Sequence, residues 1–179
     1  MAKSDSFFIR AVVTSDGTTY ADTEIDLGSF VNLGVSKSTL LRIHTISCQI
    51  ADEGSPEDSI SGASAIKIGH QLTSQKQTQL VYGNNKSLIA SGSLQTYVGN
   101  TSPDGSAADD FSTIFATQDF DVAPQDWKNG YLIGVDQLYL AVNSSGSLTS
   151  GNVKVAYVME CTLEAATQAN SVALALSQQ

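Results

Sequence analysis

The sequence is short of charge, cysteine, histidine and long apolar runs. Charged residues make up 15% of the 179 residues, whereas a typical soluble domain has about a quarter. No apolar run is long enough to cross a membrane as a helix. The start MAKSDSFF also lacks the apolar core of a secretion signal. We therefore expect synthesis in the cytoplasm and no transmembrane segment.

The common catalytic and cofactor signatures are absent as well. The sequence contains no Gly-x-Ser-x-Gly, His-Glu-x-x-His, Gly-x-Gly-x-x-Gly or Gly-x-x-x-x-Gly-Lys-Ser/Thr pattern, which removes the usual hydrolase, protease and nucleotide motifs. The two histidines, His44 and His70, lie in apolar strand-like segments, where packing or hydrogen bonding is the expected role. We expect Cys48 and Cys161 to be small buried thiols, with a disulfide between two strands as the alternative. The sequence thus predicts neither an enzyme nor a cofactor.

Basic residues are few and scattered. The chain has nine Lys and Arg against 18 Asp and Glu, which gives a net charge of -9. Because nucleic-acid binding depends on clustered cations that neutralise phosphates, we expect no direct contact with DNA or RNA. Among the acids, Asp119 and Asp121 flank Phe120 on one strand face and are weak candidates for a cation site. A solvated acidic face is the preferred interpretation, so no metal is predicted.

The most regular stretch of the chain lies between residues 131 and 163. Residues 153–163 alternate between apolar and mainly polar side chains, which is the period of a strand with one buried face. Leu138, Leu140 and Val142 form a similar apolar face on the preceding strand. The intervening residues 143–152 are rich in Ser, Gly and Asn, which favour loops. This pattern predicts two long strands joined as a hairpin around an exposed loop.

The rest of the chain contains further short strands separated by turn residues. A change of phase in the strand over residues 39–51 predicts a β-bulge near His44 or Thr45, and residues 99–110 form the most obvious exposed loop. We expect about eight strands, no long helix before residue 164, and a single domain over residues 1–179. This pattern favours an all-β antiparallel sandwich, a single jelly roll. The other expected strands are residues 6–14, 24–33, 63–72, 79–82, 88–98 and 111–122.

The tail, residues 164–179, allows two interpretations. Val172, Leu174 and Leu176 alternate as in a strand, whereas the alanines of the tail fit one side of a short helix. Either form needs a surface to lie on, because a helix of this length is marginal in water. The tail folds back over its own sheet, or it is an assembly arm that docks on a neighbouring subunit through these three apolar residues.

The pair IGVDQLYLAVNSSG…NVKVAYVMECTL and the long loop at residues 99–110 give the chain a recognisable pattern. In this pattern the chain resembles the single jelly-roll capsid proteins of small icosahedral viruses. The resemblance implies a virion structural protein, made in the host cytoplasm, that assembles with copies of itself and with other virion proteins into an icosahedral shell. The chain lacks an Arg-rich arm, which implies a genome screened from the shell by an internal membrane close to it or by other packaging proteins.

Two other classes remain as alternatives. The first is another assembly protein, either a donor-strand filament subunit or a phage tail or decoration protein. A filament subunit should have an end segment that is unpaired in the monomer and completes a neighbour's sheet. The second is a carbohydrate-binding β-sandwich module, which would normally expose several aromatic side chains on one face.

Overall fold

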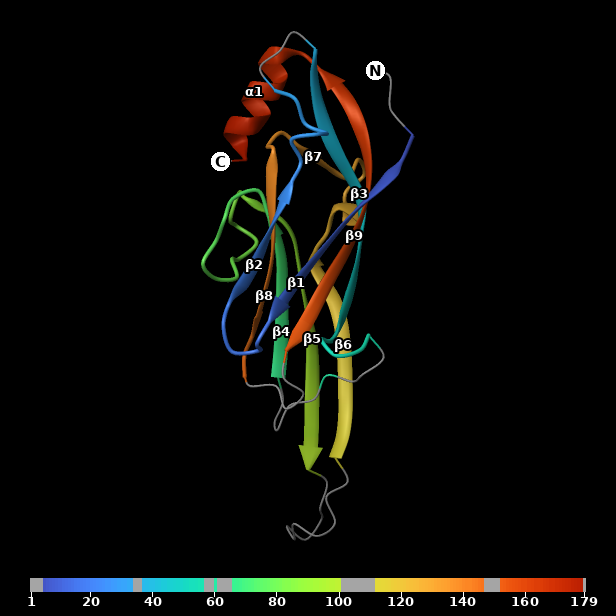
Figure 1. Ribbon diagram of the computed structural model, residues 1–179, viewed down its shortest axis with the longest axis vertical. Helices are drawn as coiled ribbons and strands as arrows, with labels where there is room; N and C mark the ends of the chain where they lie inside the picture. Colours follow the sequence, from blue (N-terminus) through green and yellow to red (C-terminus); the bar gives the residue numbers. More distant parts are fainter. Residues whose placement is uncertain are drawn as a thin grey trace.

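The computed structural model describes residues 5–33, 37–56, 60, 66–100, 112–146 and 152–178. These described residues form nine strands, one short 3-10 helix and one α-helix, and the α-helix lies at the opposite end of the molecule from the end of β5 (Figure 1). The elements are β1 (Phe7–Ser15), β2 (Ala21–Asp26), β3 (Ser38–Asp52), β4 (Ile66–Thr73), β5 (Leu88–Asn100), β6 (Ser112–Val122), η1 (Pro124–Asp126), β7 (Tyr131–Ile133), β8 (Gln137–Ser144), β9 (Val153–Ala166) and α1 (Gln168–Ser177).

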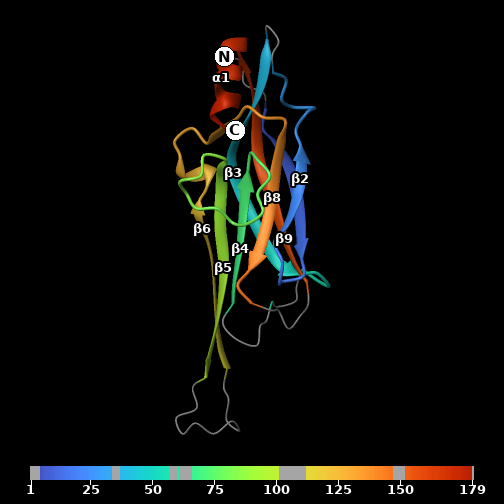
Figure 2. The same ribbon diagram turned by 90° about the vertical axis from the view of Figure 1, so that its left-hand side faces the viewer.

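The strands form two antiparallel sheets packed face to face. One sheet has the order β1-β9-β3-β7 and the other the order β2-β8-β4-β5-β6, and Figure 2 shows the strands of the second sheet side by side. Strands β1 to β4 alternate between the two sheets, and so do β7 to β9. This order is the jelly roll, in which two Greek keys fold into a sandwich, and β6 is an additional strand beside β5. The expected fold class is confirmed, with nine strands in place of about eight.

The expected hairpin between the last two strands is wrong. Strand β8 pairs with β2 and β4 in one sheet, whereas β9 pairs with β1 and β3 in the other. The chain therefore passes from one sheet to the other between Ser144, where β8 ends, and Val153, where β9 begins. Both strands have the predicted apolar faces, and these faces meet in the core from opposite sheets. A period of two identifies the buried face of a strand, but it does not identify the strand's partner.

Strand β9 is central to its sheet and supplies much of the core. Val153, Val155, Tyr157, Met159 and Cys161 are all fully buried, because this face of β9 looks toward the second sheet. Opposite them lie the equally buried Leu138, Leu140 and Val142 of β8. The predicted faces of both strands are thus confirmed, except that Leu163 is only partly buried.

The predicted β-bulge in β3 is also confirmed. The pairing of β3 with β9 shifts register between Ile43 and Thr45, so that Ile43 and Ile46 both point into the core although they are three residues apart. A bulge adds one residue to one strand and so restores the phase of its side chains. It allows a strand of 15 residues to keep apolar side chains on the core side before and after the bulge, although Cys48 and Ile50 are only partly buried.

Beyond the three residues of β7, glutamine side chains cover the free edge of β3. The Gln125 amide accepts a hydrogen bond from Ile46 N at 3.1 Å and donates to Ile46 O at 3.2 Å. Gln118 Nε2 donates to Cys48 O at 2.9 Å. These amides take the place of a neighbouring strand for the N–H and carbonyl of Ile46 and the carbonyl of Cys48, since backbone polar groups need partners. Gly130, immediately before β7, has φ +62°, and a Cβ there would lie 2.3 Å from Ile43 O, a contact that only glycine avoids.

Two expected strands differ from the structure. Residues 24–33 contribute only the end of β2, because the chain leaves the sheet after Asp26, whose Oδ1 accepts a hydrogen bond from Gly28 N at 2.7 Å. Residues 79–82 form no strand. Val81 N instead donates a hydrogen bond to Gln71 Oε1 at 2.7 Å. In both places side chains satisfy backbone groups that a strand ladder would otherwise satisfy.

Candidate functional site

The C-terminal tail forms a helix, α1, rather than a strand. Strand β9 continues to Ala166, and Thr167 then caps the helix: its Oγ1 accepts a hydrogen bond from Asn170 N at 3.4 Å. Such a cap satisfies one of the free N–H groups of the first turn. The tail contains neither Gly nor Pro, so nothing interrupts the helix before Gln178. Of the two predicted forms, the structure takes the helical one.

Polar side chains fasten α1 to its own subunit. Ser171 is fully buried, and its Oγ donates to Ser38 Oγ at 3.0 Å. At the other end Gln178 Nε2 donates to Leu132 O at 2.6 Å, while its Oε1 accepts from Gly134 N at 2.8 Å. Ser74 Oγ also donates to Gln178 O at 2.6 Å. The helix is therefore held at both ends by hydrogen bonds to the body.

The apolar residues of α1 divide between two sides of the helix. Leu174 is partly buried, and a Cβ at Gly134 would lie 3.0 Å from its side chain. Val172 and Leu176 point outward and are 43% and 65% exposed. These two residues are four positions apart and so lie on one face of the helix. Of the three predicted assembly residues, two are free for contact with another molecule and one packs on the subunit itself.

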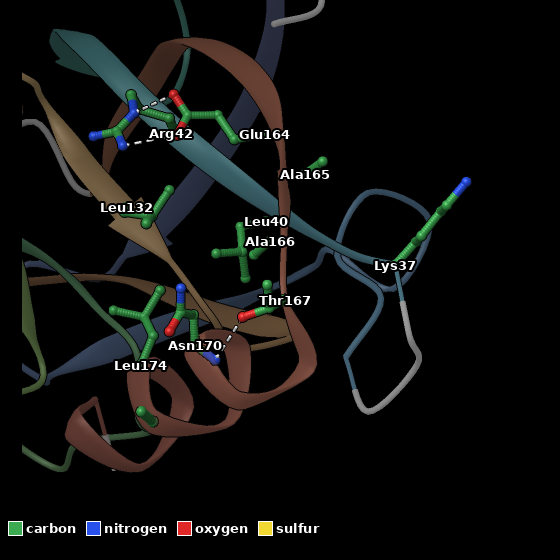
Figure 3. Close-up of a pocket in the computed structure, with 11 residues that line it drawn as sticks. Lys37, Leu40, Arg42, Leu132, Glu164, Ala165, Ala166, Thr167, Asn170 and Leu174 are labelled. Atoms are coloured by element: carbon green, nitrogen blue, oxygen red, sulfur yellow. Dashed lines mark hydrogen bonds and ion pairs between the residues drawn. The ribbon is translucent and has the colours of Figure 1, made fainter. Parts of the chain in front are cut away.

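A cavity of about 790 Å³ lies between α1 and the adjoining ends of β3, β7 and β9. Figure 3 shows apolar side chains around it, with a charged pair on one wall. The Arg42 guanidinium donates from Nε to Glu164 Oε1 at 2.6 Å and from Nη2 to Glu164 Oε2 at 2.9 Å. The pair raises the pKa of Arg42. The lining residues are Lys37, Leu40, Arg42, Leu132, Glu164, Ala165, Ala166, Thr167, Asn170, Ala173 and Leu174.

A second polar group lies between the sheets. His70 of β4 is buried; its Nδ1 is 2.5 Å from Tyr157 OH, and its Nε2 is 3.6 Å from Cys48 Sγ. Phe120 and Tyr157 both meet the imidazole ring edge-on. Burial lowers the pKa of His70 to about 4 and raises the pKa of Cys48 to about 12. Both groups are therefore neutral at pH 7, which suits a structural link between the sheets.

The other predicted histidine and cysteine roles are structural too. His44 Nε2 is hydrogen-bonded to Thr162 Oγ1 at 2.9 Å. Cys48 and Cys161 are free thiols, with Cys161 fully buried and Cys48 partly so. Burial raises the pKa of Cys161 to about 12. The expectation of two buried thiols is confirmed for Cys161 and, in part, for Cys48, and the disulfide alternative does not form.

The two acidic candidates for a cation site lie on β6. Asp119 and Asp121 are exposed, while Phe120 between them packs toward the core against His70. The pairing of β5 with β6 shifts register here, from Gly92 opposite Phe120 to Ser91 opposite Val122. Among the described residues, no group of three or more His, Cys, Asp or Glu side chains could hold a metal ion. Both acids are thus exposed on the face of β6 opposite Phe120.

The sequence did not reveal the residues that hold α1 or the pair beside the cavity. Ser171 and Gln178 are polar, so a search for apolar periodicity does not find them. Ser171 nevertheless occupies a buried position of the helix. Arg42 and Glu164 lie 122 positions apart, and only the pairing of β3 with β9 brings them together. Most of the expected exposed loop at residues 99–110, and residues 147–151 of the other, lie outside the described residues.

Comparison with protein families and with curated proteins gives no match. Among solved structures, New Jersey polyomavirus VP1 is similar, with a TM-score of 0.41 and 9% identity over 90% of this chain and 99% of that one. VP1 of the trichodysplasia spinulosa-associated polyomavirus has a TM-score of 0.35 in complex with sialylated glyco-oligomers, with 9% identity over 89% of this chain and 95% of that one. A second VP1 structure of this virus has a TM-score of 0.33, with 8% identity over 89% of this chain and 96% of that one.

These low TM-scores decide neither fold nor function. The jelly-roll fold, which capsid proteins share with lectins and cupins, rests on the strand order of the two sheets. None of the helices in the described part of the chain is long and apolar enough to cross a membrane.

Proposed function

We propose that this protein is a virion structural subunit without catalytic activity, which assembles with copies of itself into a closed shell through α1. The observation that carries the proposal is the outward face of α1, where Val172 and Leu176 are exposed on a helix that polar bonds hold to the body. A single exposed leucine is ordinary. Two apolar residues one turn apart on a fixed helix form a small preorganised contact surface.

Preorganisation matters because association must offset the entropy lost by the segment that binds. Since Gln178 and Ser171 already fix both ends of α1, the helix loses little further freedom when a neighbour covers it. The cavity of about 790 Å³ lies beside the same helix. The jelly roll alone would not carry this proposal, because one fold serves many functions.

The charge of the chain is consistent with protein partners. A net charge of -9 opposes contact with phosphates, so the partners we propose are copies of this chain and other virion proteins. The location that follows is the virion, after synthesis in the host cytoplasm, with the genome screened from the shell. An internal membrane close to the shell is compatible with this arrangement.

The alternative functions find less support. A donor-strand subunit needs an unpaired end segment, yet β1 pairs with β9 from Phe7 onward, and α1 is bound to its own body. A carbohydrate-binding face needs several exposed aromatic residues together. In the described part of the chain the large exposed aromatics are Phe8, Tyr82 and Trp127, which lie on separate elements.

A double variant of α1 tests the proposal. Val172→Ser with Leu176→Ser removes the apolar side chains from the outward face without adding charge, while the bonds of Ser171 and Gln178 remain. Tyr82→Ser, which removes an exposed apolar side chain that lies outside α1, serves as the control. We expect closed particles from the wild type and the control in negative-stain microscopy, and dispersed subunits from the double variant. Normal particles from a folded double variant would overturn the role of α1.

A further inference from the structure

Four strands end the two sheets, and three of them carry features that discourage pairing with another chain. An edge strand exposes a row of unpaired backbone groups, which proteins protect by short length, charge or irregularity. Strand β7 has three residues. Strand β2 carries three acids in six residues, and β6 carries Asp119 and Asp121 and a shift of register. The fourth edge strand, β1, differs from all three.

Strand β1 is long, regular and nearly uncharged. It has nine residues, all of them paired with β9 without a break in register, and Arg10 is its single charged residue. Phe8 and Val12 lie on its outer face and are 54% and 49% exposed, with the Arg10 guanidinium 5.8 Å from the centre of the Phe8 ring. An edge with these properties is a template for an added strand.

Strands β1 and β2 end different sheets on the same side of the sandwich (Figure 1). The turn between them is fixed by its own hydrogen bonds. Asp16 Oδ1 accepts from the backbone N–H groups of Thr18 and Thr19, both at 2.9 Å, and Ser15 Oγ donates to Thr19 O at 2.8 Å. The regular edge of β1 and the acidic edge of β2 therefore lie next to each other and form one rigid surface.

We propose that this side of the sandwich binds a second copy of the chain across a two-fold axis that runs along the strands. Strand β1 of each copy then pairs with β2 of the other copy. The four-stranded sheet of one copy thereby joins the five-stranded sheet of its partner. Because β1 and β2 run in opposite directions within one copy, the axis makes the two new pairings antiparallel. This inference rests on the proposed function, since it names one of the contacts through which the subunits assemble.

Charge complementarity favours this arrangement over the other pairings of the same edges. Pairing β2 with β2 would oppose two acidic rows, and pairing β1 with β1 would bring two Arg10 side chains together. Pairing β1 with β2 places Arg10 beside Glu24 and Asp26 of the second copy. Opposite charges across paired strands are stabilising, and like charges are destabilising.

The faces and heights of these residues also match. Ile25 is buried, so Glu24 and Asp26 lie on the outer face of their sheet, as Arg10 does on its own. The turn brings Ser15 and Ala21 to the same end of the sandwich. Arg10 is five residues from Ser15 (15 − 10), and Asp26 is five residues from Ala21 (26 − 21). Since strands rise by the same step per residue, Arg10 and Asp26 reach similar heights.

A charge swap tests the pairing. Arg10→Glu and Glu24→Arg each place like charges together, whereas the double variant restores an opposite pair. Glu24 is chosen for substitution because it is exposed and its hydrogen bond comes from the Gln137 side chain. Asp22 forms an ion pair with Lys76, and Asp26 accepts a hydrogen bond from Gly28 N. Lys86→Glu with Asp126→Arg changes the same charges at exposed sites elsewhere and is the matched control.

In sedimentation equilibrium we expect each single variant to raise the dimer Kd by about tenfold or more. The double variant should dimerise more tightly than either single variant, although Asp26 still lies beside the substituted position 10, and the control should not differ from the wild type. Should Arg10→Glu fail to fold, Arg10→Gln, which removes the charge alone, is expected to weaken the dimer as well. Single variants that dimerise as the wild type does, or a double variant no tighter than the single variants, would overturn the edge pairing alone. A wild-type chain that stays monomeric would overturn both this pairing and the proposed function.

Discussion

Tyr157 of β9 and His70 of β4 join the two sheets of the sandwich through a hydrogen bond of 2.5 Å between the phenol oxygen and Nδ1 of the imidazole. Cys48 Sγ lies 3.6 Å from the other ring nitrogen. A neutral imidazole donates through one nitrogen and accepts through the other, so both neighbours find a partner. The link depends on His70 staying neutral, because a buried charge is costly without a counter-charge.

The stability of the protein should therefore fall in mild acid. Burial lowers the pKa of His70 from 6.5 to about 4, so the unfolded chain takes up this proton before the folded chain does. The free energy of unfolding should then decrease as the pH falls from about 6.5 to about 4, by at most about 1.4 kcal/mol per pH unit and about 3 kcal/mol in all. Above pH 6.5 this contribution should be constant.

Denaturant unfolding between pH 7 and pH 4 measures this slope, with His70→Gln as the control that lacks the titrating group. The wild type should lose more stability than the variant over this range. Since the chain has two histidines, an NMR titration of their ring signals gives a direct check. A His70 signal that titrates near its ordinary pKa of about 6.5 would contradict the account of this link.

The two faces of β9 should respond very differently to substitution. Met159 is fully buried, and Met159→Ala should lower the free energy of unfolding by about 2–5 kcal/mol through lost burial and a new cavity. Lys154 lies on the opposite face and donates from Nζ to Glu53 O at 3.3 Å, so Lys154→Ala should cost less than about 0.5 kcal/mol. Chemical denaturation measures both, and equal losses would mean that the faces are assigned wrongly.

Two ion pairs within the described part of the chain should contribute unequally. Arg42 binds Glu164 with two hydrogen bonds in a largely buried position, so Glu164→Gln should cost about 1.5–3 kcal/mol. Lys76 is mostly exposed beside Asp22, and Lys76→Gln should cost less than about 1 kcal/mol, because solvent screens such a pair. Thermal or denaturant unfolding compares the two variants. A larger effect at Lys76 would contradict the importance of the Arg42 pair.

The sequence predicted what depends on local periodicity. The alternation in residues 153–163 identified the buried face of β9, and the change of phase around His44 located the bulge in β3. Both are properties of a single strand, because consecutive side chains point to opposite faces. Together with the turn residues, they were enough to indicate an antiparallel sandwich.

Contacts between distant segments could not be predicted in the same way. The sequence around residues 143–152 looks like a hairpin loop, yet β8 and β9 belong to different sheets, because the jelly roll crosses from one sheet to the other here. The fastening of α1 by Ser171 and Gln178 depends on polar side chains, which leave no apolar pattern. The sequence indicated only that His70 lies in a strand, because its hydrogen-bond partner Tyr157 is on β9 in the other sheet.

Sedimentation velocity of the full chain over a wide range of concentrations tests the central claim most directly. The claim that this protein is an assembling shell subunit predicts species much larger than the 18.8 kDa monomer, whose share rises with concentration. A single species of monomer size at every concentration would contradict it.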